Sequence, residues 1–312
     1  MSLAVVQQSV PSAGELLRRA ISAALSDIAA FVELPAPTPQ DVHLARRTAK
    51  RVRALARIAP ARLERLARQT TRAAAEARKA FGQARDAEVR RATLASLRGD
   101  LPDRAHDALA RCSNADAPAA RAADHAALSA RLSALARDWR LCDADAPATE
   151  ILAAAARVYR RARRRMKKAR SGQPRDLHRW RTAVADHEYV ADFLAASSRA
   201  AKRQGERADR LRKSLGDLND LHELAVWFGA RPLDGEANEA ALRSLDLAVG
   251  RRRKKLRRIA LRRGARLYAC RPKAWRRKVT RDVSRNTGSR DRPRTRRARQ
   301  DRPGPATRRR EA

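Results

Sequence analysis

Residues 41–59 read DVHLARRTAKRVRALARIA, and this stretch decides the fold class of the chain. On a helix that turns by about 100° per residue, its apolar side chains collect on one side. Ala45, Val52 and Leu55 mark that side, and His43 lies in the middle of the opposite, cationic side. Because the two sides separate at a helical period, the stretch predicts an amphipathic helix.

The composition of the whole chain agrees with this prediction. The 312 residues are 43% hydrophobic, much of that fraction is alanine, and only 4% are aromatic. Ala, Leu and Arg are abundant, and all three are strong helix formers. No run of alternating β-branched residues indicates a strand. We therefore predict an all-α fold whose core is made by close helix–helix packing.

The net charge points to an anionic partner. The chain has 72 Lys and Arg residues against 34 Asp and Glu, which gives a formal charge of +38. Such a chain attracts polyanions, and the candidates are DNA, RNA, an anionic membrane and inorganic polyphosphate. An arginine-rich genome is a simpler explanation that contributes to this balance but does not account for an excess of this size.

The cysteines and the apolar segments predict a cytoplasmic protein. Cys112, Cys142 and Cys270 form no C-x-x-C pair and leave an odd count, so a disulfide framework is not expected. The N-terminal residues lack the basic and apolar regions of a secretory signal. The most apolar window is short and contains Asp27, so no membrane span is expected.

The chain contains an internal repeat. His43 precedes Gly82 by 39 residues, and His178 precedes Gly216 by 38 residues. An aspartate follows each glycine after four residues. Matching order and spacing predict two pseudo-symmetric helical bundles of the four-helix type. Each bundle contributes one histidine-bearing helix to a basic central groove.

The repeat and the composition divide the chain into one domain and a tail. The predicted domain spans 14–281, with halves at about 14–140 and 149–281. From 285 to the C-terminus there are 11 arginines and 3 acidic residues. Such a segment cannot bury enough apolar surface to fold. We predict a disordered Arg-rich tail over 282–312, which offers nucleic acid a non-specific contact.

Candidate anion-binding residues lie on three predicted helices. On the helix at residues 150–170, a cationic stripe follows the helical period, and like charges one turn apart cost a few tenths of a kcal/mol each. A bound anion relieves that cost, whereas solvated side chains tolerate it. The candidates are His43, Arg46, Arg47, Lys50, Arg53, Arg57, Arg160, Arg161, Arg164, Lys168, His178 and Arg181.

These residues resemble the motifs of the CHAD family, the conserved histidine α-helical domain. The motif His-x-x-Arg-x-x-x-(Arg/Lys)-Arg-x-Arg of that family is similar to His43, Arg46, Lys50, Arg51 and Arg53. Its Leu-Gly-x-x-Arg-Asp-x-x-Val motif resembles Phe81, Gly82, Arg85, Asp86 and Val89. In the second half, the residues that resemble the family's motifs are His178, Arg181, Tyr189, Leu215, Gly216, Asp217, Asn219, Asp220 and Leu221. The resemblance covers about residues 14–281.

The resemblance implies two helical bundles that bind inorganic polyphosphate in a basic groove, with recruitment to polyphosphate granules. Some members of the family are fused to a hydrolytic β-barrel domain that carries a Glu-x-Glu-x-Lys pattern. This sequence lacks that pattern, so we expect a binding module that is not an enzyme. Ala185 and Glu188 stand where the family usually has Lys and Arg. Asp192 falls on the same face, so the groove should be less cationic in the second half.

Other functions remain open at this stage. A nucleic-acid-binding protein is one alternative, although the cationic faces carry almost no aromatic side chains for base stacking. An enzyme acting on polyphosphate or another phosphate ester is a second, although no phosphoryl-transfer motif occurs. Asp86, Asp217 and Asp220 are interpreted as helix-end or arginine-pairing residues, and no metal or cofactor is expected. His187 is interpreted as a buried, hydrogen-bonded histidine.

Overall fold

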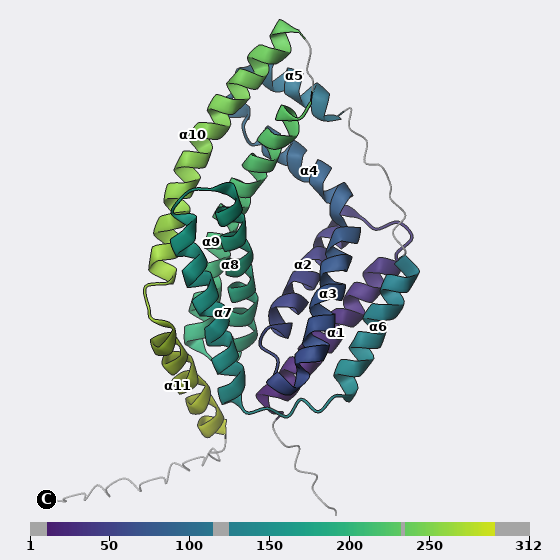
Figure 1. The fold of residues 1–312 in the computed structure, drawn as a ribbon, viewed down its shortest axis with the longest axis vertical. Coiled ribbons are helices and arrows are strands. Elements are labelled where there is room, and N and C mark those ends of the chain that lie inside the picture. Colours follow the sequence, from purple (N-terminus) through teal and green to yellow (C-terminus); the bar gives the residue numbers. More distant parts are fainter. Residues whose placement is uncertain (1–10, 115–124, 232–234, 291–312) are drawn as a thin grey trace, which may run out of the picture.

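The computed structural model describes residues 11–114, 125–231 and 235–290, and every regular element in these ranges is a helix (Figure 1). The predicted all-α fold is therefore confirmed. The α-helices are α1 (Ala13–Glu33), α2 (Pro39–Ala56), α3 (Glu64–Ala80), α4 (Gly82–Ala95), α5 (Asp103–Asn114), α6 (His125–Leu141), α7 (Ala148–Ala169), α8 (Pro174–Leu194), α9 (Arg199–Gly229), α10 (Glu236–Leu267) and α11 (Pro272–Arg290). Short 3₁₀ helices span Ala61–Leu63 and Arg98–Asp100. Among the described helices, none is both long and apolar enough to cross a membrane.

The helix that carries His43, α2, has a strong start signal. α1 ends before Pro35, because the residue preceding a proline is disfavoured in the helical conformation. Thr38 Oγ1 then accepts the backbone N–H of Asp41 at 3.2 Å, and the Asp41 carboxylate accepts the backbone N–H of Thr38 at 2.9 Å. This capping box fixes the first turn of α2. The buried side of α2 is the predicted one, with Val42, Ala45, Ala49, Val52 and Leu55.

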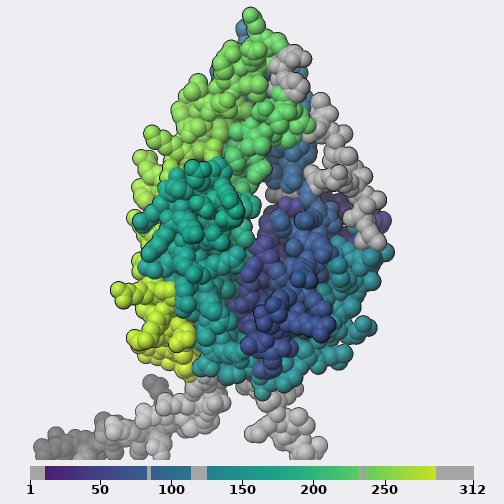
Figure 2. Space-filling model, viewed as in Figure 1, coloured from purple at the N-terminus to yellow at the C-terminus, as the bar shows by residue number. Residues whose placement is uncertain are grey.

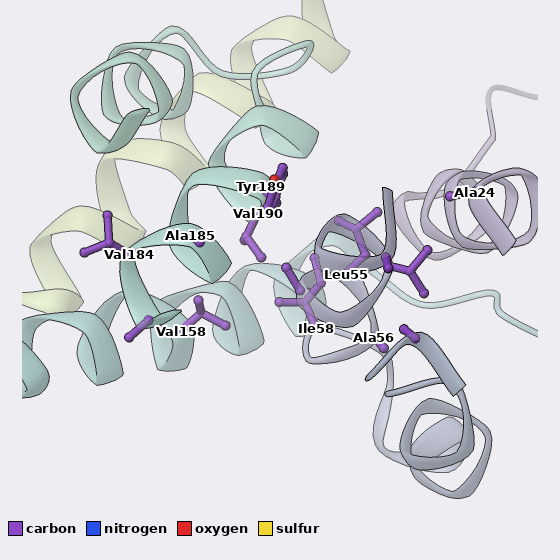
Figure 3. Packing of buried hydrophobic residues seen from close by; sticks show 14 of the residues in the cluster. Ala24, Leu55, Ala56, Ile58, Val158, Val184, Ala185, Tyr189 and Val190 are labelled. Atoms are coloured by element: carbon purple, nitrogen blue, oxygen red, sulfur yellow. The ribbon is translucent and has the colours of Figure 1, made fainter. Parts of the chain in front are cut away.

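Two bundles of helices lie side by side in Figure 1. α1, α2, α3 and α6 pack together in one bundle, and α7, α8, α9 and α11 pack together in the other, with α2 against α8 between them. The hydrophobic core is continuous across this contact. Figure 3 shows Leu55 and Ile58 beside the helices that carry Val158 and Val190. Burial of each such side chain contributes about 1.5–3 kcal/mol, so the contact fixes one bundle against the other.

A second hydrophobic cluster covers the far end of α9. α9 has 31 residues whereas α8 has 21, and the difference corresponds to about 15 Å of helix. The apolar side chains at that end of α9 pack in one cluster with those of α4, α5 and α10. The cluster contains Leu94, Leu97, Leu109, Leu221, Leu224, Phe228 and Leu245. α4 and α5 belong to the predicted half at 14–140, yet they pack against helices of the half at 149–281.

The predicted boundary of the tail at residue 282 differs from the structure, because α11 continues to Arg290. Asp282 gives the physical reason. Its Oδ2 accepts the backbone N–H of Ala200 at 2.8 Å and the hydroxyl of Ser198 at 3.0 Å, at the first turn of α9. These bonds lower the pKa of Asp282 and hold this part of α11 against α9. The rest of the predicted tail, 291–312, lies outside the described residues.

His187 is buried in an aromatic cluster, as predicted. It is 0% exposed, and its Nδ1 lies 3.2 Å from the hydroxyl of Tyr268. Its ring meets Tyr159 edge-on at 5.2 Å and lies 5.9 Å from Trp275. Burial lowers the pKa of His187 to about 3, so its ring is neutral at physiological pH. The cluster joins α7, α8 and α11 and leaves this histidine no part in anion binding.

Candidate anion-binding site

Cationic side chains from both bundles converge near Lys50. This lysine is partly buried, and its pKa is lowered to about 8. Burial is the main cause, because it disfavours the charged ammonium, and repulsion by Arg181 of α8 and Arg46 of α2 adds to it. Arg78 of α3 and Arg212 of α9 contribute further repulsion. We call Arg46, Lys50, Arg78, Arg181 and Arg212 the cation cluster.

The cation cluster draws on four helices, and it is where predicted site residues of the two halves meet. Lys50 and Arg181 are 131 positions apart in sequence, yet the charge of Arg181 lowers the pKa of Lys50. Figure 2 shows that the surface is hollowed between the α7–α8 side and the α2–α3 side, below the lobe of α9 and α10. Concentrated positive charge at partly buried positions attracts an anion more strongly than the same charge in open solvent.

Arg46 has a structural task as well. Its Nη1 donates to the carbonyl oxygens of Phe81 at 2.9 Å and Arg78 at 3.2 Å, where α3 gives way to α4. Its Nη2 lies 3.9 Å from Asp86, and the side chain is only 17% exposed. Arg46 therefore satisfies carbonyl groups left open at the end of α3.

The first motif arginine of each half lies beside the glycine of the later motif. A Cβ placed on Gly82 would lie 3.7 Å from Nη1 of Arg46, and one placed on Gly216 would lie 3.8 Å from Nη2 of Arg181. The same pair of residue types is thus in contact distance in both halves, as the matching spacing in the sequence leads one to expect.

A buried carboxylate gathers three of the predicted site residues. Asp186 of α8 is 1% exposed, and its oxygens lie 2.9 Å from Arg53, 3.1 Å from Arg57 and 3.6 Å from Arg161. Arg53 lies in α2, Arg57 directly follows the last residue of α2, and Arg161 lies in α7. Burial lowers the pKa of Arg161, and the other guanidinium groups lower it further. We call these four residues the Asp186 cluster, and it links the two bundles by charge where the apolar contact links them by packing.

Asp186 was not identified from the sequence as a residue of the candidate site. The available signal was an acidic residue on a helix side that it shares with Ala183 and Val190, which are both buried. A carboxylate at such a position needs cationic partners, because an isolated buried charge is costly. The partners could not be named from the sequence, since Arg53 and Asp186 are separated by 133 positions.

The remaining candidates are exposed. His43 and Arg47 lie on the exposed side of α2, and His178 lies near the start of α8 with Nδ1 2.9 Å from Asn219 Oδ1. The α7 stripe also faces solvent at Arg160, Arg164 and Lys168. None of these three stripe residues is among the groups whose charge lowers the pKa of Lys50. The structure thus places Arg46, Lys50 and Arg181 together and leaves the stripe apart.

Acidic side chains lie among the cations on the α8–α9 side, and they include the Glu188 and Asp192 already named from the sequence. Glu188 is buried and forms an ion pair with Arg212, which also lies 2.7 Å from Asp209. Burial raises the pKa of Glu188 to about 7, against the opposing effect of Arg212. Burial also raises the pKa of Asp192. Glu188 and Asp209 therefore largely neutralise the charge of Arg212, which is one member of the cation cluster.

Comparison with known families agrees with this arrangement. The CHAD domain family matches residues 19–229, which include both histidine motifs and end with the last residue of α9. The chain belongs to the CHAD family. A comparison with curated proteins gives no match. The CHAD match ends before α10 and α11, and that these two helices belong to the same domain stays a prediction. Among the described residues, no group of three His, Cys, Asp or Glu side chains could hold a metal ion.

Proposed function

We propose that this CHAD domain binds inorganic polyphosphate at the cation cluster, in the hollow between α2 and α8. The observation that supports the proposal is the position of Lys50 among arginines of three other elements and Arg46 of its own helix. A chain of phosphates without bases needs charge and hydrogen-bond donors along a line, which Arg forks and a Lys ammonium supply. The exposed His43 and His178 extend this line as hydrogen-bond donors.

The proposed module is cytoplasmic and is recruited to polyphosphate granules. We propose no catalytic activity for it, because the cation cluster offers donors and charge but no activated nucleophile. Incubation of the protein with polyphosphate and Mg²⁺ should therefore release no phosphate above the blank. Turnover above the blank would make the protein an enzyme and overturn this part of the proposal.

Competition with duplex DNA tests the proposal against the nucleic-acid alternative. The cation cluster contains no aromatic side chain on which a base could stack, so it distinguishes poorly among bases and favours dense phosphate charge. Labelled polyphosphate should stay bound when duplex DNA is added at equal phosphate concentration and physiological salt. Displacement of the label by duplex DNA at equal phosphate would favour the alternative.

The affinity for polyphosphate should depend on pH through Lys50. In the free protein the pKa of Lys50 is about 8, so the ammonium loses its proton as pH rises through that value. A bound phosphate favours the charged form and raises this pKa, so binding takes up a proton above pH 8. The affinity should fall between pH 8 and about pH 10, by at most about tenfold per pH unit.

The matched variant is Lys50→Arg, which keeps its charge throughout that range. Isothermal titration across the pH range should show a flatter profile for Lys50→Arg than for the wild type, with similar affinity at pH 8. Identical profiles for the two proteins would remove Lys50 from the proposed contact.

A further inference from the structure

α10 carries a row of cations on its outer side. Lys255, Arg258, Arg262 and Arg266 are all exposed, and Arg251 precedes them one turn earlier. Their spacing of three or four residues places them within about 60° to 80° of one another around the helix. From Arg251 to Arg266 the row is about 22 Å long at about 1.5 Å per residue. We call these five residues the outer row.

The outer row points away from the rest of the protein. The opposite side of α10 buries Ala260, Gly264 and Leu267. Gly264 lies so close to α8 that a Cβ placed on it would be 2.5 Å from the ring of Trp180. Figure 1 shows α10 and α11 following one another along one edge of the molecule.

Arginines on the flanks of α10 form bonds within the fold, and so does Arg251 at the start of the outer row, in contrast to the other four members of the row. Arg252 lies 2.9 Å from an oxygen of Asp100, and Arg263 donates to the carbonyl of Arg210 at 2.9 Å. Arg251 donates to the carbonyl of Asp100 at 3.4 Å. For the other four members of the row, the described residues include no hydrogen-bond or ion-pair partner. Like charges one turn apart repel, so a row of this length is a surface that an external polyanion stabilises.

We propose that the outer row binds the phosphate backbone of duplex nucleic acid, at a site separate from the cation cluster. The row lies on the outer side of a helix, whereas a thin polyphosphate chain is better held in a hollow. A duplex is wide and presents about one charge per 1.7 Å of its axis, which gives about a dozen charges along the row. The row contains only Arg and Lys, so it contacts phosphates and does not depend on base sequence.

The chemistry of α10 and α11 favours a duplex over an anionic membrane. A helix that binds in a membrane interface places large apolar side chains beside its cations. On α10, Leu256 and Leu261 pack against the core, and the exposed Leu247, one turn before Arg251, is a single large apolar side chain beside the row. α11 continues the cationic edge with exposed Lys273, Arg277 and Arg281, again spaced by one turn. This edge lies beyond the residues that the CHAD match covers.

The test is the salt dependence of duplex binding by the full chain. The row variant is Lys255→Gln with Arg258→Gln, Arg262→Gln and Arg266→Gln, and glutamine keeps the helix propensity of α10. The matched control removes the same charge from exposed positions elsewhere, with Arg65→Gln, Arg72→Gln, Arg104→Gln and Arg137→Gln. Circular dichroism checks that both variants fold. Fluorescence anisotropy then measures binding to a duplex of about 20 base pairs at several salt concentrations.

The row variant should bind the duplex at least about tenfold more weakly than the wild type at about 0.1 M salt. Its slope of log affinity against log salt should be less steep by about 3 to 4, since each phosphate contact contributes about 0.9. The control should stay within about one unit of the wild-type slope, and the polyphosphate affinity of the row variant should be retained. Equal effects in the row variant and the control would overturn the proposal. So would an unchanged duplex slope in a row variant that loses binding to polyphosphate or to phosphatidylserine vesicles.

Discussion

Asp186→Ala is expected to lower the free energy of unfolding by about 3–5 kcal/mol, because it leaves a cluster of guanidinium groups without their carboxylate. Asp186 is 1% exposed, and Arg53 and Arg57 approach it at 2.9 and 3.1 Å. Removing one partner of a buried ion pair costs more than the pair itself contributes, since the remaining charges stay desolvated. Urea denaturation followed by circular dichroism measures the change.

Two further proteins make the Asp186 result specific. Asp138→Ala removes an exposed carboxylate from α6 and should change stability by less than about 0.5 kcal/mol. Asp186→Asn keeps the shape and one acceptor, so its loss should be smaller than that of Asp186→Ala. If Asp186→Ala costs less than about 1 kcal/mol, the Asp186 cluster does not link the bundles as we infer.

The second large effect is expected for the combined variant His43→Ala, Lys50→Gln and Arg181→Gln. It should bind polyphosphate at least about 100-fold more weakly than the wild type, because charge-assisted hydrogen bonds from both halves contribute about 1.5–3 kcal/mol each. Arg46 is kept in this variant because it donates to carbonyl groups at the end of α3. Its removal would disturb the fold, so that a loss of affinity would no longer report on the binding site alone. Isothermal titration at fixed salt and pH measures the affinity.

The matched control for that variant is His125→Ala with Arg65→Gln and Arg72→Gln, which are exposed on α6 and α3. It carries the same change in charge, and it should bind polyphosphate within about threefold of the wild type. A folded combined variant with wild-type affinity would contradict the role of the cation cluster. Equal losses in the variant and the control would mean that overall charge, and no particular site, determines binding.

The helices and their buried sides could be predicted from the sequence because both are set by local periodicity. The apolar side of α2, marked by Ala45 and Val52, is buried as expected, and Tyr159 and Met166 of α7 are buried on the side opposite its cationic stripe. His187 was assigned to the core by the same reasoning. In each case, the spacing along one helix contains the information.

Features that depend on contacts between distant elements could not be predicted. Whether Arg53 and Arg57 bind a ligand or a carboxylate is decided by Asp186, which lies on a different helix. The packing of α4 and α5 across to α9 and α10 depends on the excess length of α9, which has no local signature. The end of α11 was misplaced because the bonds of Asp282 to the start of α9 outweigh the polar composition of the segment.

The cationic character of the candidate residues follows from the sequence, and their different surroundings appear only in the structure. The sequence placed twelve candidates on cationic faces, and the structure separates them by environment. Lys50, Arg46 and Arg181 belong to the cation cluster, whereas the α7 stripe lies apart from it. The weaker charge predicted for the second half takes the form of the Glu188–Arg212 pair.

A crystal structure of the protein with a polyphosphate chain tests the central claim most directly. The account predicts phosphate density in the hollow between α2 and α8, with phosphate oxygens in hydrogen-bond distance of both Lys50 and Arg181. Density that follows only the outer row of α10 or the α7 stripe, with Lys50 and Arg181 free of phosphate, would contradict it.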